Sequence, residues 1–154
     1  MTLRATLRLK GKKQGEIKGS ANQPGLPGVI LVLGFEHGLQ SPRDAGSGLP
    51  TGRRQHQQVL IQKEVDRSTP QLLQALVTNE VMQEWELCFW QSMTAERMQE
   101  VYSVRLFEAQ ILSSSSALQE GRLLERVSFV YRKIQWTYTS GNIIAMDDWQ
   151  GSVT

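Results

Sequence analysis

Residues 126–139 read RVSFVYRKIQWTYT, and this stretch decides the fold. Its apolar side chains change parity part-way along, first Val127, Phe129 and Tyr131 and then Ile134, Trp136 and Tyr138. Alternation with a period of two is typical of a β-strand with one buried face. Because a shift of one residue turns every side chain to the opposite face, the change of parity requires a bulge or a barrel corner. The stretch therefore predicts a curved β structure.

Several other segments alternate with the same period. They include LRATLRLK (3–10), EWELCFWQ (84–91) and VYSVRLFEAQIL (101–112). QVLIQKEVD (58–66) and a short segment around 16–18 are further strand candidates. VILVLGF (29–35) differs, because it is apolar on both parities and so needs cover on both faces. We expect other copies of the chain to cover the outward-facing apolar positions of this segment and of 129–138, since extended apolar patches mark such contacts.

One segment changes to the helical period. STPQLLQALVTNE (68–80) places Leu72, Leu73, Leu76 and Val77 on one stripe, and Ser68 or Thr69 followed by Pro70 is an N-terminal cap signal. The sequence thus predicts a mainly β protein, 1–154 as a single domain. Its architecture is an antiparallel β-barrel of two sheets with one α-helix (about residues 69–79) and a long extended loop (about 38–56). The serine-rich 113–121 is expected to be a flexible connection.

Composition narrows the function classes. The formal charge is +2 with a pI near 8.8, less positive than a nucleic-acid binder normally concentrates on one face. The single cysteine, Cys88, can form no internal disulfide. No stretch approaches the roughly 20 apolar residues that span a bilayer, and MTLRATLRLKGKK at the N-terminus is not a secretory signal. We expect cytoplasmic folding, with no nucleic acid bound and no membrane insertion.

Candidate catalytic and metal-binding groups are few. His37, His56 and Asp44 could ligate a metal, but they lie at separated points of a glycine-rich loop without short ligand spacing, so ordinary polar roles are expected. Asp147 and Asp148 are expected to lie in a solvated terminal turn, and Cys88 is expected to be a packed, inert thiol. The sequence therefore predicts no catalytic, metal or cofactor site and no enzyme activity.

The remaining feature is HGLQSPRDAGSGLPTGRRQH (37–56). It is rich in glycine, has no apolar periodicity, and separates two strand candidates. Loops of this length inside compact domains are uncommon and are usually functional or disordered. We expect it to be an arm or rim element that becomes ordered on assembly.

Six blocks of sequence, in order along nearly the whole chain, resemble the haemolysin-coregulated protein (Hcp) family, the tube proteins of bacterial type VI secretion systems. The blocks are GEIKGS (15–20), HGLQSPRDAGSGLPTGRRQH (37–56), KEVDRSTPQLLQAL (63–76), EWELCFW (84–90), FVYRKIQWTY (129–138) and DDW (147–149). The resemblance implies a β-barrel flanked by a helix, six copies in a ring, and rings stacked into a hollow tube. A contractile sheath propels that tube, tipped by a spike protein, with small effectors carried in the lumen.

The resemblance also implies an interface and a location. In the family the extended loop reaches towards neighbouring subunits or the next ring, which here gives the interface residues Ser41, Pro42, Arg43, Asp44, Leu49, Pro50, Thr51, Arg53 and Arg54. The protein is expected to be cytoplasmic before firing and then secreted by the machine without a signal peptide. The alternative function is a monomeric β-barrel module that binds nucleic acid or carbohydrate.

Overall fold

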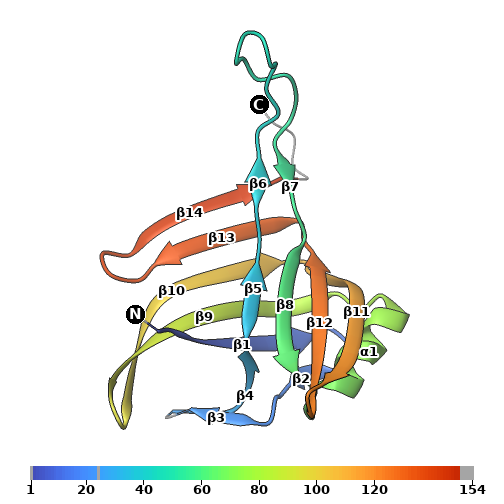
Figure 1. The fold of residues 1–154 in the computed structure, drawn as a ribbon, viewed down its shortest axis with the longest axis vertical. Helices are drawn as coiled ribbons and strands as arrows, with labels where there is room; N and C mark the ends of the chain where they lie inside the picture. The colour runs from blue at the N-terminus through green and yellow to red at the C-terminus, as the bar shows by residue number, and fades with distance from the viewer. Residues whose placement is uncertain (1, 24, 150–154) are drawn as a thin grey trace.

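The computed structural model describes residues 2–23 and 25–149, and Figure 1 shows their arrangement. Its elements are β1 (Arg4–Gly11), β2 (Gly15–Ile17), β3 (Ala21–Gln23), β4 (Leu26–Val32), β5 (Gly34–Glu36), β6 (Leu39–Gln40), β7 (Gln55–His56), β8 (Val59–Glu64), α1 (Thr69–Thr78), β9 (Met82–Thr94), β10 (Arg97–Phe107), β11 (Gln110–Gln119), β12 (Arg122–Val130), β13 (Lys133–Tyr138) and β14 (Ile143–Asp148).

Two antiparallel sheets form the body of the molecule. The larger, eight-stranded sheet runs β14-β13-β10-β9-β1-β4-β3 with β2 paired to β1, and the smaller, four-stranded sheet runs β11-β12-β8-β5. In Figure 1 the strands of the small sheet run nearly vertically in front of the horizontal strands of the large one. The predicted class, mainly antiparallel β with one helix, is confirmed. Over the described residues each sheet keeps open edges, so no continuous hydrogen-bonded ladder closes the barrel.

The core lies between these two sheets. Its fully buried side chains come from both, and Trp85 of the large sheet contacts Phe129 of the small one edge to face at 5.4 Å between ring centroids. Leu87, Val104 and Ile134 of the large sheet and Val59, Ile61 and Val127 of the small sheet have no exposed area. On 84–91 and 101–112 the alternating side chains Trp85, Leu87, Val104 and Leu106 are buried, so the two predicted strands with one buried face are confirmed.

The stretch 126–139 crosses from one sheet to the other. It ends β12 at Val130, passes through Tyr131 and Arg132, and begins β13 at Lys133. Phe129 and Ile134 are both fully buried although they lie on different parities. The change of parity is thus a barrel corner between two strands that belong to different sheets.

The stretch 29–35 crosses between sheets in the same way. β4 of the large sheet ends at Val32, and β5 of the small sheet begins at Gly34, while the backbone N–H of Leu33 donates to Gln62 of β8 over 2.7 Å. Ile30 is fully buried and Leu33 is 47% exposed. Each stretch therefore turns a corner and buries apolar side chains of both parities inside its own chain, while Leu33, Val130 and Tyr138 stay exposed. That other copies cover these outward-facing positions stays a prediction.

Helix α1 is confirmed, but its predicted stripe is only half right. Leu72 and Ala75 are buried against the sheets, whereas Leu73 is 44% and Val77 is 73% exposed. The hydroxyl of Ser68 donates to Asp66 at 2.5 Å and makes no cap bond to the helix. Among the described residues, no helix has the length and apolar character needed to cross a membrane.

The serine-rich stretch is a strand and not the flexible connection that its composition predicted. Ser113 to Ser116 lie within β11, which pairs with β12 along its length, and the hydroxyls of Ser113 and Ser128 lie 2.5 Å apart across the two strands. Serines are tolerated here because β11 is an edge strand whose outer positions meet solvent.

Candidate functional site: the arm and its base

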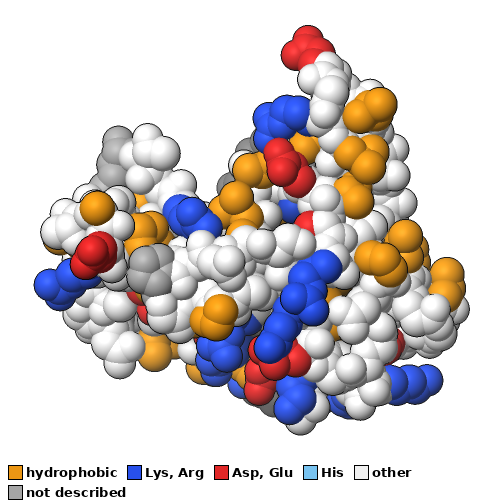
Figure 2. All heavy atoms as spheres, turned by 90° about the horizontal axis from the view of Figure 1, so that it is seen from below, with side chains coloured by type: hydrophobic (Ala, Val, Ile, Leu, Met, Phe, Trp, Pro, Cys, Tyr) orange, Lys and Arg blue, Asp and Glu red, His pale blue; other side chains and the backbone are white. Residues whose placement is uncertain are grey.

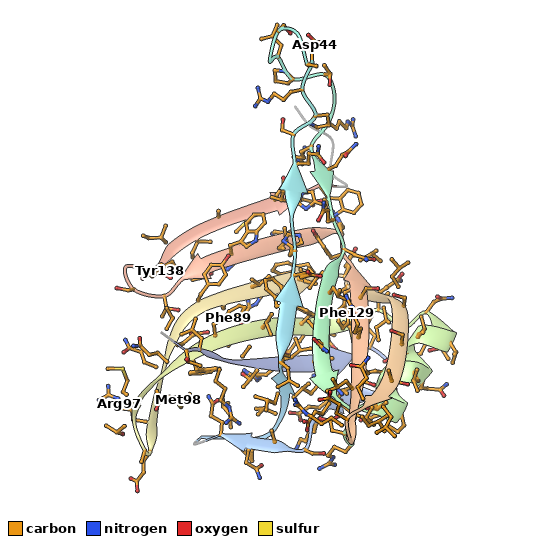
Figure 3. The ribbon with its side chains drawn as sticks, in the orientation of Figure 1. Asp44, Phe89, Arg97, Met98, Phe129 and Tyr138 are labelled. Atoms are coloured by element: carbon orange, nitrogen blue, oxygen red, sulfur yellow. The ribbon has the colours of Figure 1, made fainter. Side chains whose placement is uncertain are left out.

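The chain between β5 and β8 leaves the barrel as a projecting arm, residues 38–56 (top of Figure 1). At its root β6 pairs with β7, and further out Arg43 and Pro50 form an isolated bridge. The turn at its tip is held by Asp44, whose side chain accepts the backbone N–H of Ser47 at 2.8 Å. In Figure 3 Asp44 lies at the far end of the arm from the core residue Phe129. The predicted extended loop is therefore a hairpin-like arm with internal pairing.

Most of the predicted interface residues are presented to solvent on this arm. Ser41, Arg43, Asp44, Leu49, Pro50, Thr51 and Arg53 are exposed, and Pro42 and Arg54 are half-buried. Leu49 is 64% exposed, so its own chain covers little of this apolar side chain. Arg54 differs from the others because its guanidinium points back to the barrel.

Arg54 is bound to the end of β14. Its Nε donates to Oδ2 of Asp147 over 2.5 Å, and its Nη2 donates to Oδ1 over 2.8 Å. Nη2 also donates to the backbone carbonyl of Asp148 over 3.2 Å. Such bidentate pairs fix orientation as well as distance. The arm is therefore attached to the barrel at its root by a directional contact.

Four ring side chains join Arg54 and Asp147 in this attachment. We name His37, Arg54, His56, Tyr131, Asp147 and Trp149 the arm-base cluster. The side chain of His56 is 1% exposed, with Nε2 2.7 Å from Asp147 and Nδ1 3.0 Å from the Tyr131 hydroxyl. His37 Nε2 lies 2.6 Å from the same hydroxyl. The indole of Trp149 stacks on His56 and donates to the Tyr131 carbonyl over 2.6 Å.

The electrostatics of the cluster follow from burial and from Arg54. The hydrogen bonds from Arg54, followed by those from His56, hold the pKa of Asp147 below its ordinary value. Burial lowers the pKa of His37, and the neighbouring His56 lowers it further. Burial raises the pKa of Tyr131, so its hydroxyl keeps its proton for hydrogen bonding. The cluster is thus built to hold the two ends of the arm together at neutral pH.

Sequence reasoning missed this cluster. Asp147 was expected in a solvated turn, but it lies within the strand β14 and its side chain is only 25% exposed. His37 and His56 were placed at opposite ends of a loop, and the arm brings those ends together because it folds back on itself. Asp44 stays at the arm tip, so the three residues weighed as metal ligands do not meet. The signal available was the apolar run IIAM before DDW, which indicates a last strand.

A second group of polar side chains lies on β9 and β10. Glu86, Cys88 and Glu100 have ligand atoms within 4.8 Å of one another. Burial raises the pKa of the Cys88 thiol, hydrogen bonding to Glu100 raises it further, and the thiol donates to Glu86 over 3.3 Å. Arg105 Nη2 donates a hydrogen bond to the other carboxylate oxygen of Glu86 over 2.8 Å. A protonated thiol is a poor metal ligand, and the expectation of a buried thiol is confirmed.

The chain resembles known proteins along its whole length. The family model described as "Type VI secretion system effector, Hcp" matches residues 7–138. The Major exported protein of Pseudomonas aeruginosa is 32% identical over 170 residues, which cover 99% of this chain and 99% of that protein.

Solved structures agree with the sequence matches. Hcp1 from the E. coli EAEC 042 pathovar, solved as a mutant, superposes with a TM-score of 0.88 at 32% identity, covering 96% of this chain and 99% of the other. The secreted protein Hcp3 of Pseudomonas aeruginosa superposes with a TM-score of 0.81 at 28% identity, covering 97% of this chain and 100% of the other. By fold and by sequence, the chain belongs to the haemolysin-coregulated protein (Hcp) family of the bacterial type VI secretion system.

Proposed function

We propose that this protein is the tube component of a type VI secretion system, forming hexameric rings that stack into a hollow tube. The observation that supports this most directly is the arm, which projects from the barrel with seven of the predicted interface residues exposed and its root fixed by Arg54 and Asp147. Fixing the direction of an exposed arm adds no contact within a monomer. An assembling protein gains a contact element whose direction is already set.

Two kinds of contact are needed for such a tube. A contact between two different surfaces of the same chain generates a ring when its rotation closes, and a second such contact along the axis never closes and so extends the tube. The arm is polar and glycine-rich, which suits a weaker, reversible contact between rings. We infer that the lateral contact within a ring is larger and more apolar than the axial contact between rings.

The tube function implies partners and a location. The protein would be made in the cytoplasm and exported with the tube, in contact with itself, the spike protein, the contractile sheath and small effectors in the lumen. Its role would be structural, without catalysis and without a cofactor or metal. Membership of a secretion-system family and the relative named Major exported protein support export.

Electron microscopy with light scattering tests this proposal. We expect ring-shaped particles of six copies in dilute solution and longer stacks as the protein concentration rises. Arg43→Ala with Asp44→Ala should shorten the stacks and leave the ring mass unchanged. The exposed pair Glu64 and Arg122, replaced by alanine in the same way, serves as a charge-matched control outside the arm. A monomer at every concentration would refute the proposal.

A further inference from the structure

We infer that two uncharged apolar surfaces on opposite sides of the barrel contact each other in neighbouring copies of the chain. The first, the hairpin flank, is residues 134–146. The second, the helix flank, is residues 68–79 together with 109–119. This inference rests on the proposed ring and identifies the two surfaces that make its lateral contact. No residue in any of the three runs carries a charge, although charged residues make up 21% of the chain.

The hairpin flank exposes apolar side chains on both faces of β14. Ile143 is 67%, Ile144 is 46% and Met146 is 53% exposed, and consecutive residues of a strand point to opposite faces. Tyr138, paired with Ile143 on β13, is 47% exposed. Solvent-exposed positions of an edge strand in a stable monomer usually carry charge or proline, because exposed apolar edges aggregate. β14 therefore has the composition of a strand that is covered in the assembled protein.

The arm closes only one end of this edge. β14 is the terminal strand of the large sheet, so one side of its backbone has no neighbouring strand within the described chain. Arg54 donates to the carbonyl of Asp148 at the end of β14 nearest the arm base. The part from Ile143 to Met146 remains accessible, and this is where the exposed apolar side chains lie.

The helix flank also exposes apolar side chains and carries no charge. Helix α1 carries no acidic residue in its first turn and no basic residue in its last, and its exposed side includes Leu73 and Val77. An exposed helix face is ordinarily charged. β11 runs beside α1 and exposes Leu112 at 53% and Leu118 at 71%. The helix and the strand are neighbours, and neither segment carries a charge.

The positions of the two flanks make them complementary between copies. In Figure 1 the β13–β14 turn lies at the left of the molecule and α1 lies at the right, and Tyr138 is labelled on the left in Figure 3. Opposite flanks of one chain cannot meet each other, but the left flank of one copy can meet the right flank of the next. Depletion of charge is typical of interface centres, and neither flank contains a charged residue.

Figure 2 shows how charged and hydrophobic side chains are distributed on one face of the molecule. In that view Lys and Arg side chains alternate with Asp and Glu near the middle, while hydrophobic side chains follow one another along the right-hand side. On this face the hydrophobic side chains are therefore more frequent along that side than near the middle. A second copy of the chain is the occupant that fits both flanks, because pairing the hairpin flank of one copy with the helix flank of the next covers the exposed apolar side chains of both without burying a charge.

Two lysine substitutions test the contact. Ile144→Lys disables the hairpin flank, and Val77→Lys disables the helix flank. Each introduces an ammonium that would be desolvated without a partner in the interface, so we expect each variant to weaken the contact at least about a hundredfold and to remain monomeric. Leu33→Lys is the matched control, since Leu33 is 47% exposed and lies on neither flank. Circular dichroism checks that all three variants are folded.

Mixing the two variants gives the distinctive result. The intact hairpin flank of Val77→Lys can bind the intact helix flank of Ile144→Lys, and the remaining flanks are both disabled, so growth stops at a dimer. Native mass spectrometry of the mixture should therefore show a one-to-one heterodimer, which neither variant forms alone. Rings in either lysine variant, or no heterodimer from two folded monomers, would overturn the flank assignment. A monomeric wild-type protein would instead overturn the proposed ring itself.

Discussion

Arg54 and Asp147 lie 93 residues apart in the sequence, and their side chains form a bidentate pair with donor–acceptor distances of 2.5 and 2.8 Å. This contact joins the root of the arm to the last strand of the large sheet. His56 takes part in the same contact, because its Nε2 lies 2.7 Å from the Asp147 carboxylate. The orientation of the arm is therefore coupled to the C-terminal strand and not only to the strands that flank it in sequence.

Asp147→Asn should loosen the arm without unfolding the barrel. The amide keeps the shape of the carboxylate but offers Arg54 one acceptor oxygen instead of two, and it carries no charge to pair with the guanidinium. We expect trypsin to cleave after Arg53 or Arg54 several-fold faster, with little change in melting temperature. Asp44→Asn at the arm tip is the control, measured at the same two bonds. Equal cleavage in wild type and Asp147→Asn would show that the pair does not hold the arm.

His37 should make stability depend on pH. Burial and His56 lower its pKa below the ordinary 6.5 in the folded protein, so between those two values the unfolded chain binds more protons. Stability from this source is complete above about pH 6.5 and is lost as pH falls through the lower, folded-state value. The other groups at this site are Arg54, His56, Tyr131 and Asp147.

Urea unfolding between pH 7.5 and 5 measures this contribution. The loss of stability on acidification should be smaller in His37→Gln than in wild type. The difference in slope can reach at most one proton, about 1.4 kcal/mol per pH unit. Identical slopes in the two proteins would show that His37 titrates alike in the folded and unfolded states.

Part of this architecture could be predicted from the sequence because local periodicity decides it. The strands of 84–91 and 101–112 and the helix of 69–78 are periodic over their own length, so their existence followed from pattern alone. The change of parity at Tyr131 indicated a corner but not which sheets it joins. That depends on pairing of β12 with β8 and of β13 with β10, which are contacts between distant segments.

The arm-base cluster could not be predicted for the same reason. His37 is 94 residues from Tyr131, and Asp147 is 91 residues from His56, so no spacing in the sequence connects them. The serine run was misread because its composition is that of a linker, while its structure is set by the neighbouring β12. Composition predicts flexibility only where no partner strand is available.

Two glycines distinguish a packed from an open position. A Cβ at Gly19 would lie 2.4 Å from the carbonyl oxygen of Val29 and 2.6 Å from Cα of Ile30, both backbone atoms that cannot move aside cheaply. Gly52 on the arm has no atom within 4 Å of that position. Gly19→Ala should destabilise the fold by about 2 kcal/mol or more, and Gly52→Ala should change it by less than about 0.5 kcal/mol. Similar melting temperatures for the two variants would contradict this close approach of the backbones.

Cys88 should be unreactive in the native protein. It is 4% exposed, and burial with neighbouring Glu100 and Glu86 raises the pKa of its thiol, so the reactive thiolate is scarce at neutral pH. A disulfide reagent should modify it only after addition of denaturant. Rapid modification of the folded protein at pH 8 would show that β9 opens locally.

Lys63 connects the small sheet to the start of the helix flank. Its ammonium is fully buried and bonds to Glu125 of the paired strand, to Asp66 at 3.1 Å and to the Thr69 hydroxyl at 3.4 Å. Lys63→Met leaves the buried Glu125 carboxylate without its cationic partner and with the Thr69 hydroxyl at 3.2 Å as a remaining donor, which should cost about 3–5 kcal/mol. Adding Glu125→Leu removes that unpaired charge, and Asp66 still accepts two bonds from Ser68.

The double variant should therefore be more stable than Lys63→Met alone. Urea unfolding of the wild type, both single variants and the double variant gives the coupling energy. A double variant as unstable as the sum of the singles would mean that Lys63 stabilises the fold through Asp66 and Thr69, at the N-terminus of α1. In that case Lys63→Met should also displace the helix flank and weaken ring formation, whereas a strong coupling to Glu125 predicts that the folded double variant still forms rings.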